Sequence, residues 1–512
     1  MIGENSMWES IISTIEKVND TLNGIVWGWP VIILILGTGI LLTVRTRFLQ
    51  VTHFGESLNT TIIPTLKGLG KKKQKDSRLQ SVSQFEAFAT AISGTVGTGN
   101  IVGVVSAILT GGPGAVFWMW ISAFFGMVTN YSENVLGLYY RKKDKDGNLS
   151  GGAFYYIAYG LKWKWLAYLA AIFCMFAAIG MSGVQTNKIS GTLAEALSRA
   201  SSLENTQTIK LIVGIVVAII TAVVIIGGIK RIGRVASLLV PFMSLLFIVM
   251  ALIAIGMHFK NIPSAFGLIF SKAFNFKAAG GGILGYSFAQ VIKKGMARGV
   301  FSNEAGLGSS VIAHSASETR EPVKQGLWGV FEVFFDSFII CTLTAIMFLT
   351  TFDLTALSTE AEDSVMSMNM FSTSFGGFGT AIFSIILPLF AFTTVIAWSY
   401  YGEKAVDFCF GWVKIEKRKY IVGAFKIIYV LLIALSSVIH SELIWAIDDT
   451  FNGLMAVPNL ICLLALSGLV VKITKNYFER KKGKKVEPML SAYPEMNKEF
   501  AEDILTDNIE MK

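Results

Sequence analysis

The sequence predicts an all-α protein that crosses a membrane many times. Of its 512 residues, 53% are hydrophobic and only 15% are charged, whereas a soluble domain carries roughly 25% charged residues. Apolar stretches of about 20 residues recur, and each is long enough to cross a hydrocarbon core of roughly 30 Å. Because these stretches show no alternation of polar and apolar residues, we expect helices and not barrel strands.

We expect eleven transmembrane helices. Their approximate ranges are 25–44, 85–109, 114–140, 165–187, 209–228, 235–257, 284–315, 325–350, 378–402, 420–440 and 445–471. The first 24 residues carry acidic side chains and lack a basic head ahead of a short apolar core, so no cleavable signal peptide is expected. The spans themselves are expected to direct insertion.

Basic residues are distributed unevenly among the connecting segments. Six alternate segments hold 33 of the 44 Lys and Arg residues. These segments are 45–84, 141–164, 230–234, 316–324, 403–419 and the tail from 472. The positive-inside rule therefore places the N-terminus outside and the C-terminal tail in the cytoplasm. We interpret the net charge of +9 as a topology signal and not as a nucleic-acid-binding surface.

Two of the expected spans are interrupted by glycine and polar residues. Span 85–109 contains Ser93–Asn100 (SGTVGTGN), and each glycine there costs a helix roughly 1 kcal/mol relative to alanine. Span 284–315 contains Asn303–Ser310 (NEAGLGSS). With span 25–44 set aside as an accessory helix, each interrupted span is the first of five. This arrangement predicts a five-plus-five inverted repeat with discontinuous helices at matching positions.

The chain is therefore expected to divide into five segments. These are an extracellular N-terminal segment (1–24), an accessory helix with a basic cytoplasmic loop (25–84), a first inverted repeat (85–257), a second inverted repeat (284–471) and a cytoplasmic tail (472–512). The four cysteines sit singly in or beside apolar segments, so neither disulfides nor structural zinc is expected.

The interruptions offer backbone groups to a ligand. Unwound backbone in a membrane is tolerated only where protein buries it or where it lines a wet cavity. Around Gly94–Asn100, free N–H groups suit a carboxylate, and freed carbonyls suit Na⁺ or an ammonium group. The alternative is that these glycines are small-residue packing positions. The second interruption, in which Asn303 offers a further amide, favours a binding site.

Four longer motifs follow one another along the chain. They are Val96–Ile101 (VGTGNI), Gly111–Trp120 (GGPGAVFWMW), Arg298–Gly308 (RGVFSNEAGLG) and Thr393–Thr394 followed by Trp398–Glu403 (WSYYGE). Together they closely resemble the signature of the alanine or glycine:cation symporter family, and the similarity spans most of the chain. The resemblance implies the five-plus-five fold of the wider amino acid, polyamine and organocation transporters. It also implies uptake of alanine or glycine by alternating access, coupled to Na⁺ or sometimes to H⁺.

The resemblance further implies where the amino acid binds. The Gly97-Thr98-Gly99 turn resembles the family's clamp for the substrate carboxylate, and Gln185, with Asn187 nearby, resembles the polar side chain of its third core span. A Gln amide can donate to a carboxylate without adding a buried charge. The alternative for Gln185 is a helix-end residue near the outer interface. The expected substrate-binding residues are Gly97, Thr98, Gly99, Gln185, Asn303, Thr394 and Trp398.

Trp398 follows Thr394 by four residues and so lies on the same helix face one turn later. We expect it to form a wall of the pocket and to limit the size of the substrate. The alternative is that it serves for packing or as an interfacial anchor.

A sodium site between the first and eighth core helices is also implied by the resemblance. The hydroxyls of Thr393 and Thr394, with nearby carbonyls, would supply hard oxygen ligands without a formal charge. The expected ligands of Na⁺, the one cofactor expected, are Ser93, Val96, Asn100, Thr393 and Thr394. The alternative for the threonines is back-bonding within their own helix.

Acidic residues inside the spans need partners, because charged groups are costly in lipid. For Glu304, in the second interruption, we expect a structural or gating role in which it hydrogen-bonds freed backbone. For Asp336 we expect pairing with Lys293, Lys294 or Arg298, which are the basic residues of a broken span.

The sequence thus predicts a secondary transporter and not an enzyme. It contains no ATP-binding GxxxxGK[ST] loop and no recognisable catalytic constellation. The alternatives are the same fold carrying glutamine or serine, coupling to H⁺, and a passive channel. The expected partners are a small neutral amino acid, Na⁺ and the lipid bilayer, without nucleic acid or an obligate protein partner. The resemblance implies a prokaryotic plasma membrane.

Overall fold

The computed structural model describes residues 2–67, 81–143, 147–200, 205–274, 287–354, 362–439 and 441–507. Residues 68–80 of the predicted basic loop and 508–512 of the predicted tail lie outside the described residues.

The described chain is almost entirely helical. Its first part forms α1 (Ile2–Val26), α2 (Trp29–Arg45), α3 (Leu49–Thr52), α4 (Phe54–Thr60), α5 (Ile62–Lys67), α6 (Gln84–Thr95), η1 (Thr98–Asn100), α7 (Val102–Gly111) and α8 (Ala115–Tyr139). Its middle part forms β1 (Lys142–Lys143), β2 (Leu149–Ser150), α9 (Ala153–Tyr159), α10 (Lys164–Ala200), α11 (Thr206–Ile225), α12 (Gly228–Met257), η2 (Phe259–Asn261) and α13 (Ile262–Ala273). Its last part forms α14 (Phe288–Asn303), α15 (Val311–His314), α16 (Pro322–Val333), the π-helical η4 (Phe334–Cys341), α17 (Thr342–Thr351), α18 (Asp363–Phe375), α19 (Gly377–Cys409), α20 (Ile415–Ser436), α21 (Ser441–Lys481) and α22 (Pro494–Asp507).

Eight helical stretches of the described chain are long and apolar enough to cross a membrane. They are Ser13–Arg45, Lys164–Ala200, Thr206–Ile225, Gly228–Met257, Pro322–Thr351, Gly377–Cys409, Ile415–Ser436 and Ser441–Lys481. The three other expected spans coincide with α6–α7, with α8 and with α14–α15. The all-α, multi-pass character is therefore confirmed, while the number of eleven spans and the division into five segments stay predictions.

The apolar membrane-spanning stretch that contains the accessory helix begins earlier than expected, although α2 itself begins at Trp29. Pro30 stands in the first turn of α2, where its missing N–H removes no helical hydrogen bond. The apolar stretch that includes α2 extends back to Ser13, so it takes in part of the segment predicted to lie outside.

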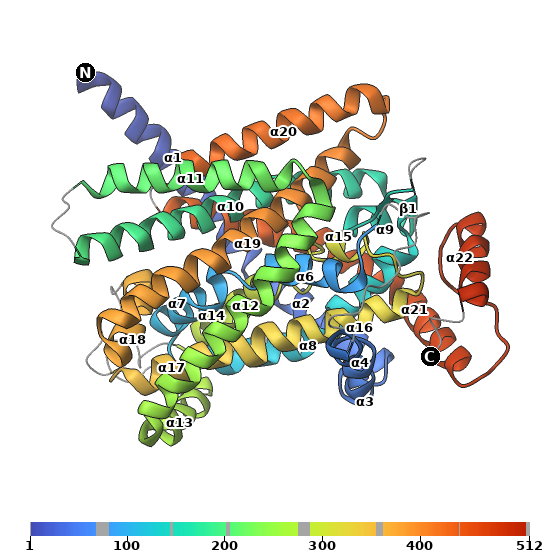
Figure 1. The fold of residues 1–512 in the computed structure, drawn as a ribbon, viewed down its shortest axis with the longest axis horizontal. Coiled ribbons are helices and arrows are strands. Elements are labelled where there is room, and N and C mark those ends of the chain that lie inside the picture. Colours follow the sequence, from blue (N-terminus) through green and yellow to red (C-terminus); the bar gives the residue numbers. More distant parts are fainter. Residues whose placement is uncertain are drawn as a thin grey trace.

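The long helices run side by side between two ends of the molecule (Figure 1). One end carries α13 and α18, and the other carries β1, α9 and α22. In the middle, α10 packs along α19, and α8 packs against α14 and α16. The outer faces of α11, α12 and α20 expose large apolar side chains such as Ile219, Leu238 and Ile427. Such faces are expected to contact lipid.

Both predicted interruptions are confirmed as breaks. The first separates α6, which ends at Thr95, from α7, which begins at Val102, with the short η1 turn between them. The second separates α14 from α15 and is longer. Gly306 and Gly308 in the second break have φ angles of 96° and 75°, a left-handed conformation that favours glycine. Each break thus occurs where the sequence concentrates glycine.

The segment that follows α15 ties several elements together at the α22 end. Val82, just before α6, donates its N–H to the carbonyl of Ala316 and accepts from the N–H of Glu318. The buried Arg141 donates to the carbonyls of Ser315, Ser317 and Thr319. The ends of both broken helices are therefore joined here through backbone groups.

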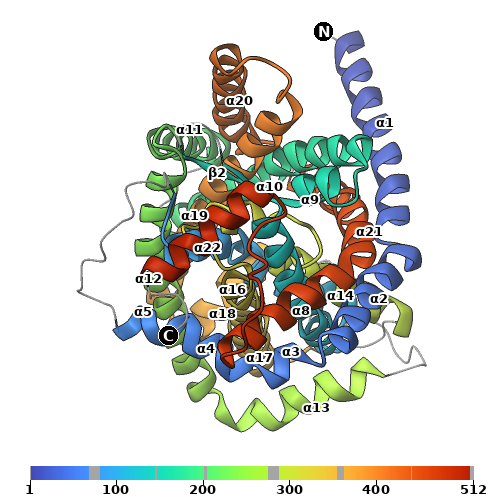
Figure 2. The same ribbon diagram turned by 90° about the vertical axis from the view of Figure 1, so that its right-hand side faces the viewer.

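Helix α22 docks onto this junction. Asp503 pairs with Arg320 at 2.7 Å, and the buried ring of Phe500 lies 5.4 Å from the guanidinium of Arg141. Seen from this end, α22 lies across the helix bundle (Figure 2). The predicted tail is thus a structured part of the molecule and not only a solvated extension.

Candidate functional site

The first break is held open by amide groups. The N–H of Gly97 donates to Oδ1 of Asn100 at 2.9 Å, and the N–H of Thr98 donates to Oε1 of Gln185 at 3.1 Å. Gln185 lies on α10, so one side chain of the third core span reaches the backbone of the break. The predicted contact between Gln185 and the glycine turn is therefore present, and the side chain is not at an exposed helix end.

Gly97 is the point at which three helices converge. A Cβ atom at Gly97 would lie 2.5 Å from Oγ1 of Thr394 and 3.3 Å from Oε1 of Gln185. Its φ of −129° is open to other residues, so glycine is required here for space. Among the predicted substrate residues, the structure brings together Gly97, Thr98, Gln185 and Thr394. Gly99 faces another helix, because a Cβ there would lie 3.3 Å from the ring of Phe301.

Polar atoms around the first break lack protein partners. Oγ1 of Thr98 and the hydroxyl of Tyr401 are buried and form no hydrogen bond with any described residue. The Tyr401 hydroxyl lies against Gly94, where a Cβ would be 2.8 Å away. The only described acceptor for Nε2 of Gln185 is the sulfur of Met181 at 3.4 Å. Since buried polar groups are normally paired, these atoms mark where a polar ligand would be accommodated.

The expected sodium ligands are split between two faces of α19. Oγ1 of Thr394 donates to the carbonyl of Ser93 at 2.9 Å, which joins α19 to α6. Oγ1 of Thr393 instead donates to the carbonyl of Phe390 and lies 3.5 Å from the sulfur of Met243 on α12. Val96 is buried and caps the C-terminus of α6. Ser93 and Thr394 thus bring two hard oxygens together, which fits a sodium ion, whereas Thr393, on the same helix as Thr394, faces α12.

The two predicted amides lie at the edges of this site. Asn100 donates from Nδ2 to Oδ1 of Asp336 at 2.5 Å while its own oxygen accepts from Gly97. Asn303 donates to Oγ of Ser337 at 3.1 Å and accepts from the N–H of Ala305. No described contact joins either amide to Thr393 or Thr394. In this structure both amides support the breaks, and their roles as ligands stay predictions.

The expected partner of Asp336 was wrong. Its carboxylate accepts hydrogen bonds from the side chains of Asn100, Ser302 and Ser337. Arg298 instead pairs with Asp449 at 3.1 Å. A helix rises about 1.5 Å per residue, so Arg298 lies about one turn from Ser302, toward the end of the molecule that carries Asp449.

The expectation for Glu304 was also wrong in its partners. Glu304 accepts from Nε1 of Trp398 at 2.9 Å and from Oγ of Ser309 at 2.5 Å. The freed backbone of the second break is bound by Glu133 on α8, whose Oε1 accepts from the N–H groups of Gly306 at 3.1 Å and Gly308 at 3.0 Å. Glu133 was missed, although an acidic residue inside the span 114–140 was a signal that could have found it.

Asn459 on α21 completes the support of the second break. Its Nδ2 donates to Oε1 of Glu133 at 2.5 Å and to the carbonyl of Gly306 at 2.8 Å. The N–H groups of Gly306 and Gly308 and the carbonyl of Gly306 are thus all hydrogen-bonded by side chains of α8 and α21.

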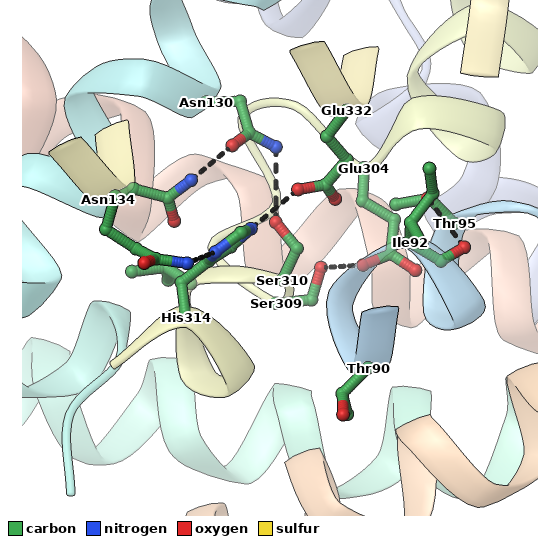
Figure 3. A network of polar contacts seen from close by, with 12 residues as sticks. Thr90, Ile92, Thr95, Asn130, Asn134, Glu304, Ser309, Ser310, His314 and Glu332 are labelled. Atoms are coloured by element: carbon green, nitrogen blue, oxygen red, sulfur yellow. Dashed lines mark hydrogen bonds and ion pairs between the residues drawn. The ribbon is translucent and has the colours of Figure 1, made fainter. Parts of the chain in front are cut away.

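A second polar network extends from the same break (Figure 3). Nε2 of His314 lies 2.7 Å from Oε2 of Glu332, and Nδ2 of Asn130 donates to Oγ of Ser310 at 3.2 Å. Asn134 in turn donates to Asn130 at 2.7 Å. Sequence reasoning assigned no role to these residues, because each bond joins helices that are distant in the sequence.

Trp398 is a buried wall between the two breaks. Its indole N–H binds Glu304 of the second break, and its ring packs edge-on against that of Tyr401, with centroids 5.3 Å apart. Tyr401 in turn lies against Gly94 of the first break. The position agrees with the expected wall, although the packing alternative uses the same contacts.

A cavity of about 1060 Å³ leads toward the first break from the end that carries α18. Arg298, Trp445 and Asp449 are among its lining residues. Behind them the rings of Phe301 and Trp445 stack with centroids 5.4 Å apart, and the Arg298 guanidinium lies 4.9 Å from the Trp445 ring. Because Phe301 also abuts Gly99, this stack separates the cavity from the glycine turn.

Comparisons with known proteins place the chain among transporters. The family model of the sodium:alanine symporter family matches residues 12–491. The sodium/alanine symporter AgcS of Methanococcus maripaludis is 41% identical over 478 residues, which cover 90% of this chain and 97% of AgcS. The probable sodium/glutamine symporter GlnT of Bacillus subtilis is 33% identical over 474 residues and covers 92% of both chains.

A solved structure supports the fold independently. MhsT, determined in complex with L-phenylalanine, superposes with a TM-score of 0.56 at 15% identity, covering 78% of this chain and 99% of MhsT. The predicted transporter fold with two discontinuous helices is thereby confirmed, as is the predicted family. The chain is a multi-pass membrane protein, and it belongs to the sodium:alanine symporter family, whose members are Na⁺-coupled amino-acid symporters.

Proposed function

We propose that the protein imports a small neutral amino acid, alanine or glycine, together with Na⁺ by alternating access. The observation that carries the proposal is the convergence of Gly97, Gln185 and Thr394 around buried polar atoms that lack a described partner. A zwitterion offers a carboxylate for N–H and amide donors and an ammonium group for carbonyl acceptors.

The crowding at the first break favours a small side chain on the substrate. Gly97 leaves no room for a methyl group, and the rings of Phe301, Trp398 and Tyr401 surround the turn. Glutamine or serine is the alternative substrate. One relative that matches over most of its length, GlnT, is described as a probable sodium/glutamine symporter. The ring of Trp398 or Phe301 would have to move before the site could admit a substrate with a longer side chain.

Uptake of labelled alanine into proteoliposomes tests this proposal. We expect uptake to be driven by an inward Na⁺ gradient and to be inhibited by glycine more strongly than by glutamine. Uptake that ignores Na⁺ and follows an imposed pH gradient would establish the H⁺-coupled alternative. Stronger inhibition by glutamine than by glycine would establish the larger substrate.

Ser93, Val96, Thr393 and Thr394, with Asn100 at the edge, are proposed to bind the co-transported Na⁺. The hydroxyl of Thr394 and the carbonyl of Ser93 bridge α6 and α19, so an ion held there would join the first broken helix to the helix that carries Trp398. Binding would favour the arrangement in which these helices are close, which is the requirement for coupling ion binding to a conformational change.

The substitution Thr394→Val tests the sodium site. Because valine keeps the shape but removes the hydroxyl, we expect the half-saturating Na⁺ concentration to rise about 10-fold, which corresponds to the loss of one net hydrogen-bond-sized interaction. Ser399→Ala is the matched control, since the one described acceptor for the Ser399 hydroxyl is the carbonyl of Ile396 within α19. An unchanged Na⁺ dependence in Thr394→Val would exclude this ligand.

We also propose that the α22 end faces the cytoplasm of a prokaryotic cell and that the N-terminus lies outside. The support is the concentration of basic residues in the segments at this end. The Phe301–Trp445 stack would then close the outer path, and the Val82–Ala316 pairing would close the inner one. Labelling of single cysteines at residues 210 and 417 by an impermeant maleimide on intact cells should mark only residue 210.

A further inference from the structure

A second cavity, of about 880 Å³, opens at the α22 end of the molecule. It lies where the start of α10, the turn between α11 and α12, the end of α19 and the start of α20 come together. Its described lining includes two acidic residues, Glu403 and Asp407, and eight basic ones. The basic residues are Lys142, Lys143, Lys164, Lys230, Lys404, Arg418, Lys419 and Lys426.

The two acidic side chains are already used by basic neighbours. Glu403 pairs with Lys426 and Asp407 pairs with Arg418, each at 2.9 Å. Lys404 instead donates to Oγ of Ser150 at 3.0 Å and lies 5.5 Å from the ring of Tyr400. Lys143 pairs with Glu499, which is not among the lining residues. With three of the eight basic residues paired in this way, the described lining still carries more basic than acidic residues.

Aromatic residues around this cavity indicate its depth in the membrane. Trp163 and Trp165 flank Lys164, their rings stack with centroids 6.3 Å apart, and both are exposed. Trp412, in the turn before α20, and Tyr420, near the start of α20, are exposed by 77% and 71%. Trp and Tyr gather at membrane–water interfaces, where an apolar ring meets the headgroups. The cavity thus lies at the level of the headgroups.

The walls of the cavity continue into surfaces that face lipid. Ile226, at the end of α11, is 75% exposed, and Ile427 and Ile428 on α20 are 65% and 52% exposed. Gly227, Gly228 and Gly423 line the cavity between these helices and present no side chain there. The phosphate group of a phospholipid can therefore enter the cavity from the side, while the acyl chains of the same lipid lie against α11 and α20.

We infer that this cavity binds the headgroup of an anionic phospholipid from the surrounding leaflet. Basic pockets between transmembrane helices recognise such headgroups through their phosphate charge. The apolar flanks favour a lipid over a soluble phosphate compound, because they would contact acyl chains that a soluble compound lacks. Lys404 lies about 1.7 turns beyond Trp398 on α19, so a bound headgroup would stabilise the position of the helix that also carries Thr394.

The double variant Lys404→Gln with Lys419→Gln tests this inference. Both side chains line the cavity, and glutamine keeps a polar side chain of similar length without the charge. The matched control is Lys414→Gln with Lys417→Gln, which removes the same charge from exposed positions at the start of α20 that do not line the cavity. Retention of phosphatidylglycerol and of phosphatidylcholine by each purified carrier is measured by native mass spectrometry over a lipid titration.

We expect the unaltered protein and the control variant to retain phosphatidylglycerol in preference to phosphatidylcholine. The cavity variant should need at least ~10-fold more phosphatidylglycerol for the same occupancy. Equal retention by the cavity variant and the control would overturn the inference. Displacement of the lipid by glycerol 3-phosphate at an equal concentration would also overturn it, because the ligand would then be a soluble phosphate. If the double variant shows no cooperative thermal unfolding and so is not folded, the single variant Lys419→Gln, at an exposed position, is compared with the control instead.

Discussion

The break in the first broken helix and the break in the second are held by different chemical groups. At the first, the N–H groups of Gly97 and Thr98 donate to the neutral amides of Asn100 and Gln185. At the second, the N–H groups of Gly306 and Gly308 donate to one carboxylate, that of Glu133. Buried hydroxyls without a described partner lie at the first break, on Thr98 and Tyr401.

This difference separates binding from mechanical support. Neutral amides leave room for the carboxylate of a substrate, whereas a carboxylate already in place would repel a second one. A carboxylate that accepts from two backbone N–H groups and from Asn459 also holds its glycine turn firmly. We therefore expect changes at the second break to affect stability first and changes at the first break to affect transport first.

The largest effect is expected for Glu133→Ala. It leaves the N–H groups of Gly306 and Gly308 and one N–H of the Asn459 amide without their acceptor, and each buried donor left unsatisfied costs about 1–3 kcal/mol. We expect the midpoint of thermal unfolding in detergent to fall well below that of Glu133→Gln, which keeps one acceptor oxygen. Ser132→Ala is the control, since among the described residues that hydroxyl bonds only to the carbonyl of Val128. An unchanged midpoint in Glu133→Ala would mean that the second break supports itself.

A smaller effect, confined to transport, is expected for Gly97→Ala. Its methyl group would meet Oγ1 of Thr394 at 2.5 Å, and overpacking of this kind costs about 1–3 kcal/mol. We expect alanine uptake to fall about 10- to 100-fold while the unfolding midpoint changes little. Gly103→Ala in the same broken helix is the control, because a Cβ there meets nothing within 4 Å. Equal uptake by the two variants would show that the first break does not form the site.

The smallest effect is expected for Trp398→Phe. The Trp398 side chain connects the two breaks. Phenylalanine keeps an aromatic ring against Tyr401 but removes the N–H that binds Glu304, a loss of about 1 kcal/mol. We expect a modest drop in both the unfolding midpoint and uptake. Trp445→Phe, in the stack with Phe301, is the comparison variant, since its indole N–H has no partner among the described residues. A change in uptake without any change in stability would assign Trp398 to the binding site alone.

The sequence was sufficient for the features that depend on local pattern. Apolar runs long enough to cross lipid predicted the spans, and clustered glycines predicted both breaks. The convergence of Gln185 and Thr394 on Gly97 was reached only through the resemblance to a family, because no periodicity relates residues so far apart. The spacing of residues within a motif cannot by itself show which faces of three helices meet.

The errors concern the partners of buried acids. Asp336 was expected to pair with basic residues of the second broken span. Its carboxylate instead accepts hydrogen bonds from three neutral donors on three segments. Glu133 was overlooked because its partners lie 173 and 175 residues away. In a membrane protein a buried charge is satisfied by whichever donors packing brings close, and that depends on how helices are arranged and not on the order of residues.

The docking of α22 has a consequence for how the protein is made. Phe500 and Asp503 follow the long helix α21 in the sequence, yet they contact Arg141 and Arg320 at the junction of both broken helices. Segments fold as they emerge during synthesis, so the helices from α6 to α21 emerge before α22 can dock. Completion of the junction therefore waits until α22 has been synthesised.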